Sequence, residues 1–431
     1  MVDLTKHSNK SIMSGKFMAG VIISVLCTNY LVAQNINGKI ISSESPVTIL
    51  KIWGSHQERG FAYGYLLGEK ISQTFATYSN SISKCKYRKL RGLIENQNCL
   101  EIDEAFLNEA KSMIDGMNKA KTNSYHLDHI DLLIINSIFD ISGIKCLSRI
   151  KSFACSSLMS WGETTKGTDL NGASVISRHF DWFNSDGILN NQVILIHIPS
   201  ESNEQPWLNI GIAGQIGVTS AINKSGVSAF LHTAPFTALK GSNDKEYTPV
   251  MFALRKGIES KNVNADQQDD IFDILAVLSA SKNGFSRPCI VSALAPATGR
   301  TSDRIAMVAE LIPDFPYLVL RGNEYEDEIP GDNLYTANSL LKFKSRRQHG
   351  NRNKDMISAL GEGKNISSEK NWELMRDHSR FKVPFDIETN IQFMQYIPEM
   401  NILKLSVSTD KTPAYLQKPV SFDLNYFFST P

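Results

Sequence analysis

The sequence predicts an α+β fold in which layered sheets carry helices on the outside. The chain has 431 residues, of which 42% are hydrophobic, so it can bury a sizeable core. Its first part has helical periodicity, whereas short apolar strands separated by Gly, Asn and Ser turns follow residue 155. We find no repeat or linker and therefore expect one compact unit.

Three segments of the first part place apolar residues three and four positions apart, at 59–71, 102–114 and 127–139. This spacing gives a helix one face that packs on a core. We expect only short strands before residue 150. Later segments read as strands, several of them apolar on both faces, with one helix at 270–278 among them: 157–161, 173–178, 192–198, 226–232, 304–310 and 317–320.

The amino terminus has the pattern of a secretory signal peptide at residues 1–33, with cleavage near Ala33. Lys6, Lys10 and Lys16 precede the apolar run 17–27. A buried helix or a membrane anchor is the alternative, but the run is short for a membrane span. No later stretch is long and apolar enough to cross a bilayer, so we expect export to the periplasm or the extracellular space and no stable membrane span.

The overall charge gives no sign of a nucleic-acid partner, because the chain has 45 basic and 44 acidic side chains. A small-molecule substrate fits better. The sequence lacks the histidine and cysteine spacings of zinc sites and the glycine-rich loops that bind phosphates, so we expect neither metal nor cofactor. The oligomeric state is left open.

Of the six cysteines, five remain once the signal peptide is removed. An odd number in an exported protein needs a reason. Cys85 and Cys99 could form a disulfide or stay unpaired, and Cys146 and Cys289 sit among apolar residues like core thiols. This leaves Cys155 as the cysteine without an assigned structural role.

Cys155 begins an apolar strand, and the next strand ends with Arg178 and Asp181. Taken alone, these are the features of a core thiol and a surface ion pair. A cysteine released as a new amino terminus would, however, carry its own base, because an α-amino group titrates near pH ~8. Arg178 could then hold the thiolate or a substrate carbonyl, and Asp181 could orient the ammonium group.

Six blocks in order resemble the choloylglycine hydrolase and acyl-coenzyme A:6-aminopenicillanic acid acyltransferase group of N-terminal-nucleophile (Ntn) hydrolases, closest to the acyltransferase branch. The resemblance covers roughly residues 50 to 355. The blocks are Gly54–Gly64, Cys155-Ser-Ser, Ser177-Arg-His-Phe-Asp-Trp182, Ala221–Val227, Ala306–Glu310 and Tyr335-Thr-Ala-Asn-Ser339.

The resemblance implies a four-layer αββα sandwich and self-cleavage between Ala154 and Cys155. A helical α chain, 34–154, and a catalytic β chain, 155–431, would then share one domain. Cys155 would be the nucleophile that attacks a linear amide. The family roles imply four further catalytic residues, which are Arg178 for substrate binding, Asp181 for orienting the amine, Asn338 for the oxyanion, and a late arginine at 347 or 352, with Arg352 preferred.

Three departures bear on the substrate. A polar loop, 163–171, lengthens the hairpin between Cys155 and Arg178. His232 or Thr233 stands where bile-salt hydrolases have a second oxyanion asparagine, so these two are candidate substrate-binding residues and bile-salt specificity is not expected. Asn338 is followed by Ser instead of the usual His.

The sequence thus predicts an exported, self-processing cysteine amidase that hydrolyses an N-acyl small molecule or transfers its acyl group. A phospholipase B-like or lipid-amide hydrolase with the same nucleophile is the alternative within this class. A non-catalytic exported binding protein, in which Cys155 is a core thiol, is the alternative from a different class.

Overall fold

The computed structural model describes residues 36–43, 47–96, 99–144, 155–182, 184–234, 239–242, 244–299, 304–322, 329–343, 351–379, 390–409 and 412–431. Residues Ile36–Pro431 form one unit. The predicted signal peptide, Ala154, Cys146 and Arg347 lie outside the described residues.

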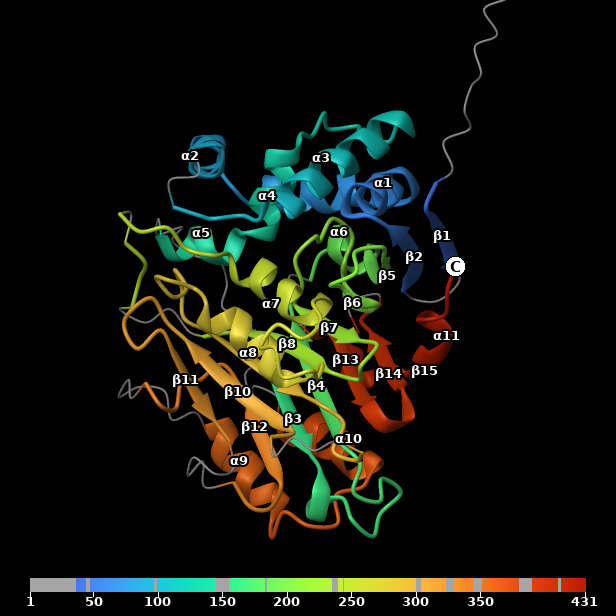
Figure 1. The fold of residues 1–431 in the computed structure, drawn as a ribbon, viewed down its shortest axis with the longest axis vertical. Helices are drawn as coiled ribbons and strands as arrows, with labels where there is room; N and C mark the ends of the chain where they lie inside the picture. Colours follow the sequence, from blue (N-terminus) through green and yellow to red (C-terminus); the bar gives the residue numbers. More distant parts are fainter. Residues whose placement is uncertain are drawn as a thin grey trace, which may run out of the picture. The chain divides into compact units, whose positions relative to one another are not determined.

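Two sheets organise this unit (Figure 1). The nine strands of the larger sheet are, in spatial order, β1 (Gly38–Ser42), β2 (Thr48–Gly54), β5 (Gln192–Pro199), β6 (Trp207–Ile212), β7 (Ser220–Asn223), β8 (Ser228–Thr233), β9 (Cys289–Leu294), β10 (Ala306–Leu311) and β11 (Leu318–Arg321). The six strands of the smaller sheet are β12 (Asn333–Thr336), β3 (Ser156–Ser160), β4 (Val175–Asp181), β13 (Asn390–Ile397), β14 (Ile402–Val407) and β15 (Val420–Asp423). Among the described strands, β2 and β5 pair in parallel and the other neighbours pair antiparallel.

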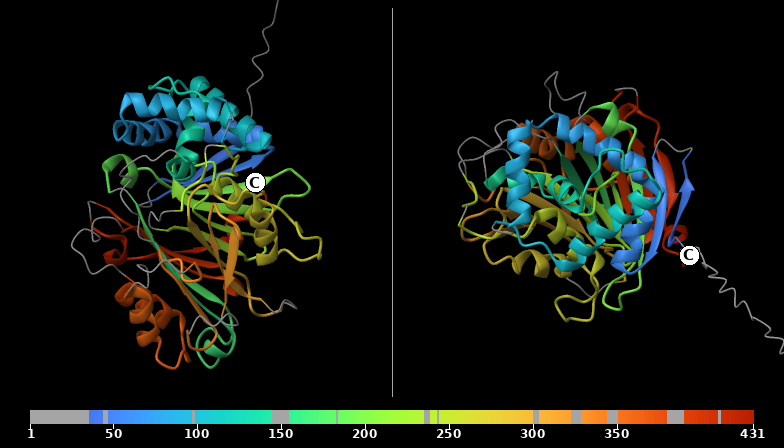
Figure 2. Two further views of the ribbon diagram at one scale, coloured as in Figure 1. Left: turned by 90° about the vertical axis from the view of Figure 1, so that its left-hand side faces the viewer. Right: turned by 90° about the horizontal axis from the view of Figure 1, so that it is seen from above.

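Helices cover the outer face of each sheet (Figures 1 and 2). Those on the larger sheet share one apolar cluster with it: α1 (His56–Asn80), α2 (Lys84–Glu95), α3 (Glu104–Lys119), α4 (His129–Asn136), α5 (Ile138–Ile144), α6 (Asp186–Leu189), α7 (Val250–Glu259) and α8 (Ile271–Ser279). On the smaller sheet, α9 (Asn351–Leu360) and α10 (Ser368–His378) pack against β3, β12 and β13. A short helix, α11 (Leu424–Phe427), follows β15.

The layers are visible in the packing of the apolar side chains. Ile194 and Ile210 of the larger sheet and Met159 and Met394 of the smaller one belong to a single buried cluster between the sheets. Side chains of opposite parity, such as Leu195, belong instead to the cluster beneath the helices, because neighbouring residues of a strand face opposite sides. The arrangement is helix, sheet, sheet, helix, which confirms the predicted α+β class and its four layers.

Local signals explain where the first helix begins and how it packs. Ser55 caps α1, and the carboxylate of Glu58 accepts a hydrogen bond from the Ser55 N–H at 2.8 Å, which completes a capping box. Glycines allow α1 and α3 to approach closely: a Cβ on Gly64 would lie 1.8 Å from the carbonyl oxygen of Met113. Any larger side chain at Gly64 would therefore push the two helices apart.

Every segment that the sequence singled out falls on a helix or strand, and one cysteine hypothesis is not supported. The predicted helices and strands all fall on helices and strands of the structure, and the loop 163–171 lies, as expected, between β3 and β4. The optional disulfide between Cys85 and Cys99 does not form, since both residues keep their thiols in the described chain. Cys85 lies exposed on α2, whereas Cys99 is buried in the core. In the parts of the chain that are described, no helix combines the length and apolar character needed to cross a bilayer.

Candidate active site

Cys155 lies directly before β3, on the side of that strand that faces the larger sheet. Its side chain is 2% exposed. The backbone N–H of Cys155 donates a hydrogen bond to Oδ1 of Asn338 at 2.8 Å, across 183 positions of sequence. The fold therefore brings together the predicted nucleophile and the predicted oxyanion residue.

Arg178 comes from the neighbouring strand, where it pairs in register with Ser157. It is completely buried and bridges the two sheets, because Nη1 donates to the carbonyl of Thr219 and Nη2 to that of Leu231, each at 2.7 Å. The same Nη2 lies 3.9 Å from the Cys155 sulfur. The guanidinium is thus fixed beside the thiol by backbone carbonyls of the other sheet.

Burial affects the charge of both Cys155 and Arg178. Burial raises the pKa of the Cys155 thiol, Arg178 acts in the opposite direction, and Asp181 adds to the increase. Burial also lowers the pKa of Arg178 to about 10, against the influence of Cys155. At neutral pH the arginine therefore keeps its charge and faces a thiol that needs a base to ionise.

Asp181 ends β4 and is held by an asparagine that the sequence did not single out. Nδ2 of Asn390, on β13, donates to Oδ1 of Asp181 at 2.9 Å, and the two residues are register partners. The backbone N–H of Asp181 also lowers the pKa of the Cys155 thiol. Asn390 lies 209 positions from Asp181, so only the pairing of β4 with β13 reveals its role.

Asn338 connects the thiol strand to two further predicted residues. Its Nδ2 donates to the carbonyl of Thr233 at 2.5 Å, and its Oδ1 accepts from Nη1 of Arg352 at 3.2 Å. Arg352 also donates through Nε to the carbonyl of Ser379 at 3.1 Å. The structure therefore brings Arg352, the preferred late arginine, to the site, and adds Ser379 as its anchor.

The two candidate substrate-binding residues have different surroundings. Thr233 lies beside Asn338, as described. His232 points between the sheets, where its Nε2 lies 3.2 Å from Ser157 Oγ and 3.0 Å from Ser292 Oγ. Burial, followed by the charge of Arg178, holds the pKa of His232 well below its usual range. His232 is therefore a neutral core histidine that supports the strand of Cys155.

A narrow, mostly apolar cavity adjoins Thr233. Its ionisable members other than Cys289 are Asp140 and Arg287, and burial raises the pKa of Asp140 to about 7. This pKa leaves Asp140 half-protonated near neutrality and reduces its electrostatic cost. The cavity is lined by Phe139, Asp140, Leu231, Thr233, Val250, Arg287, Pro288 and Cys289.

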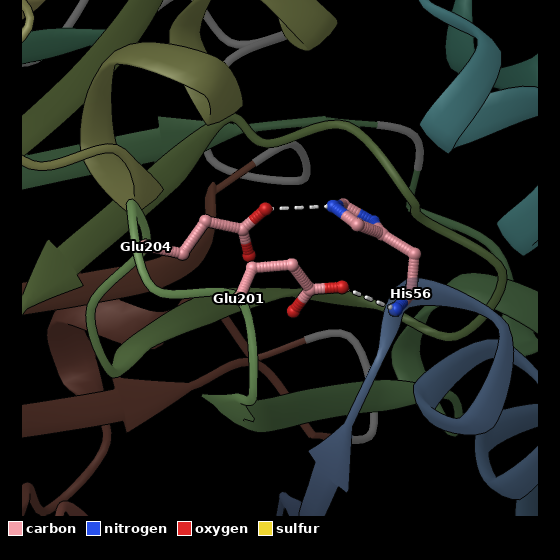
Figure 3. Close-up of side chains that lie close together, drawn as sticks. All are labelled: His56, Glu201 and Glu204. Atoms are coloured by element: carbon pink, nitrogen blue, oxygen red, sulfur yellow. Dashed lines mark hydrogen bonds and ion pairs between the residues drawn. The ribbon is translucent and has the colours of Figure 1, made fainter.

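A second cluster of charged groups lies where α1 begins, and it includes a possible metal-ligand set that the sequence did not reveal: His56, Glu201 and Glu204. Figure 3 shows the ring of His56 facing Glu204, with Nε2 and Oε1 2.9 Å apart, while the backbone N–H of His56 donates to Glu201. The buried guanidinium of Arg59 would compete with a metal ion for these carboxylates, since its Nη2 lies 2.9 Å from Glu204. These contacts describe an ion-pair network.

No protein-family model matches the chain, and no curated protein does. Solved structures do. A Caenorhabditis elegans N-acylethanolamine-hydrolyzing acid amidase ortholog aligns at 12% identity and a TM-score of 0.40, covering 62% of this chain and 100% of that one. A mutant of conjugated bile acid hydrolase from Clostridium perfringens aligns at 13% and 0.36, covering 62% and 93%. Penicillin V acylase from Agrobacterium tumefaciens aligns at 12% and 0.38, covering 63% and 86%.

All three proteins are Ntn hydrolases of the group that the sequence resembles. At this identity and superposition, the alignments assign no residue role to this chain. Roles for the residues of the site rest on their own contacts.

Proposed function

We propose that the protein is an exported cysteine amidase that cleaves itself before Cys155 and then hydrolyses the linear amide of an N-acyl small molecule. One observation carries this proposal. The sulfur of a buried cysteine lies 3.9 Å from a fully buried guanidinium, and the amide of the same cysteine donates to Asn338. A core thiol needs neither a buried cation nor a polar partner reached across 183 residues.

The reaction follows from these contacts once Cys155 has a free α-amino group. That group takes the thiol proton, and the thiolate sulfur attacks the acyl carbon of the substrate. The carbonyl oxygen becomes an oxyanion, and its proposed donor is the Nδ2–H of Asn338 that does not bond the Thr233 carbonyl. The C–N bond then breaks, the leaving amine takes the proton from the α-ammonium, and water hydrolyses the thioester to release the acid.

Arg178 has a defined task in this scheme. Because burial raises the pKa of the Cys155 thiol, the thiolate needs a neighbouring positive charge. The guanidinium supplies it without moving, since Thr219 and Leu231 already fix its position. Asp181, held by Asn390, is the proposed partner of the α-ammonium.

The acceptor of the acyl group defines a variant of the same function. If an amine reaches the thioester before water does, the enzyme is an acyltransferase. A lipid-amide or phospholipase B-like hydrolase, with the same nucleophile, is the second candidate.

Intact-mass spectrometry of the full chain tests the proposal. We expect the wild type to give two fragments that meet between Ala154 and Cys155, and Cys155→Ala to stay uncut. Cys289→Ala is the matched control, because Cys289 is also a free, buried cysteine but lies on β9. It should cut like the wild type. An uncut wild type would end the amidase proposal and favour a binding protein.

Export has a test of its own. The mature protein recovered from the periplasm or the medium should begin close after Ala33 when its amino terminus is sequenced. A protein that stays in the cytoplasm with residues 1–33 attached would overturn this part of the proposal and leave the amidase part untouched.

A further inference from the structure

We propose that Glu310 and Arg321 act as positioning residues for Asn338, by fixing the chain on both sides of it to the larger sheet. This inference rests on the proposed function. The pair lies on β10 and β11, whereas Asn338 follows β12 of the smaller sheet. The pair of Glu310 and Arg321 therefore links the two sheets next to Asn338, whose side-chain amide must keep a fixed position in the proposed reaction.

Glu310 holds the chain that follows Asn338. Its side chain is 0% exposed, and Oε1 lies 2.9 Å from Nε of Arg321. The carboxylate also accepts three successive backbone N–H groups, those of Leu341 at 2.7 Å, Lys342 at 3.0 Å and Phe343 at 3.4 Å. An anion bonded to several amides in a row is a strong local anchor.

Arg321 holds the chain that precedes Asn338. Its Nη1 donates to the carbonyl of Tyr335 at 3.3 Å, and its Nη2 donates to Oγ1 of Thr336 at 3.2 Å. The two side chains thus bond to positions 335–336 and 341–343, and Asn338 lies between these anchored stretches. The planar fork of the guanidinium makes both contacts at once, which a lysine could not do.

A fixed position matters for Asn338 because its amide serves several partners. Oδ1 accepts from the Cys155 N–H and from Arg352, and Nδ2 donates to Thr233. A donor that stabilises an oxyanion loses its effect when it moves by about 1 Å. Loss of the Glu310 charge would free positions 341–343 and leave Arg321 buried without this counter-charge.

The decisive experiment compares Glu310→Gln with Glu109→Gln in the full chain. Glu109 is equally buried and pairs with Arg255 at 2.6 Å, but in the charged cluster at the start of α1. We expect Glu310→Gln to slow self-cleavage and lower kcat by at least about tenfold, with KM nearly unchanged. Glu109→Gln should lower Tm but keep cleavage and kcat within about twofold of the wild type.

A milder pair of variants covers the case in which the charge changes prevent folding. Thr336→Val removes the hydroxyl that Arg321 binds, and Thr165→Val makes the same change at a buried threonine whose hydroxyl donates to Ala173 at 2.9 Å. We expect Thr336→Val to lower kcat by at least about threefold at a Tm equal to that of Thr165→Val. Equal kcat values within each pair at matched Tm would overturn the proposal.

Failure of the proposed function would look different. In that case the wild type itself stays uncut and inactive. The anchoring is then judged by the rate at which iodoacetamide alkylates Cys155, well below every Tm. Glu310→Gln should raise that rate by at least about threefold over Glu109→Gln, because a released Asn338 no longer holds the Cys155 backbone and the buried thiol opens to solvent more often. Equal alkylation rates would overturn the positioning role as well.

Discussion

Arg178 shows how a single residue can connect both sheets to the proposed nucleophile, Cys155. It leaves the smaller sheet, donates to two carbonyls of the larger one and ends beside the thiol. Phe180 and Phe230 lie against its guanidinium, 5.2 and 4.9 Å from their ring centroids. Such contacts exclude water and strengthen the electrostatic effect of the cation on the sulfur.

Arg178→Lys tests this arrangement. A lysine ammonium lacks the fork needed to bind both carbonyls and face the sulfur, so the thiolate loses part of its stabilisation. We expect the pH profile of iodoacetamide alkylation at Cys155 to shift to higher pH, and the unfolding free energy to fall by about 1–3 kcal/mol. Arg376→Lys, at an exposed ion pair with Asp377, should leave both unchanged. An unshifted profile would show that Arg178 does not act on the thiol.

At this scale, sequence reasoning reached only part of the site. The residues around Cys155 and Arg178 could be predicted because they resemble known blocks. Asn390 and Ser379 could not, because each is an ordinary polar residue that acquires its partner only when distant strands and helices meet. His232, a candidate substrate-binding residue, stays a prediction, and its contacts with Ser157 and Ser292 between the sheets could not be read from its place in the chain.

Among the secondary-structure elements, the start of α1 carries a cluster of buried charged side chains. Burial opposes a charge on His56, but hydrogen bonds to Glu109 and Glu204 outweigh it and raise the pKa of His56 to about 9. Arg255 also faces the ring and works against the increase. His56 is thus a protonated bridge between α1, α3 and the loop after β5.

The stability of the fold should follow this protonation. The pKa of His56 in the folded protein lies above the unfolded value of about 6.5. Protonated His56 therefore makes its full contribution to the unfolding free energy below pH ~6.5, and this contribution is lost as the pH rises through about 9. We expect the unfolding free energy to fall by up to about 3 kcal/mol across this window in urea titrations. His56→Gln should remove this pH dependence of the unfolding free energy, whereas His126→Asn, at an exposed turn, should keep it. Parallel curves for His56→Gln and the wild type would refute the protonated bridge.

Two glycine-to-alanine substitutions should have opposite effects, one where α1 contacts α3 and the other on α2, where the added Cβ has room. Gly64→Ala should destabilise the fold by at least about 2 kcal/mol, because the new Cβ would overlap the Met113 carbonyl. Gly92→Ala, on α2, meets its nearest atom at 3.9 Å and should stabilise by up to about 1 kcal/mol, since Ala favours a helix. Thermal unfolding of both variants checks this, and equal Tm values would contradict it.

Many elements, among them β13 and α10, were not singled out from the sequence, and those that were often differed in extent. Periodicity placed a helix at 59–71, but α1 runs from His56 to Asn80, because polar positions in its later turns hide the pattern. The parallel pairing of β2 with β5 was not predictable, since it joins segments that lie more than a hundred positions apart. The four layers, in contrast, were implied by the family resemblance, and the order of helical and strand-forming segments indicated layered sheets with helices outside.

For the molecule as a whole, the segment before Cys155 is part of the same fold as the segment after it. It supplies β1 and β2 to the larger sheet, where β2 pairs with β5, and it supplies the helices α1 to α5. We therefore expect the two fragments of the cleaved protein to elute together in size-exclusion chromatography and to separate only in denaturant. Separation under native conditions would show that the pairing of β2 with β5 does not survive cleavage.

If the chain cleaves itself as proposed, the hydrogen bond between Cys155 and Asn338 also sets the order of events during biosynthesis. Cleavage that uses Asn338 and Arg352 would have to wait until the ribosome has made both residues and the sheets have closed around them. A nascent, truncated or misfolded chain would keep its thiol without an amine base and remain inert. The cut fraction of a sample would thus count the molecules that have completed folding, and could serve as a direct assay of folding yield.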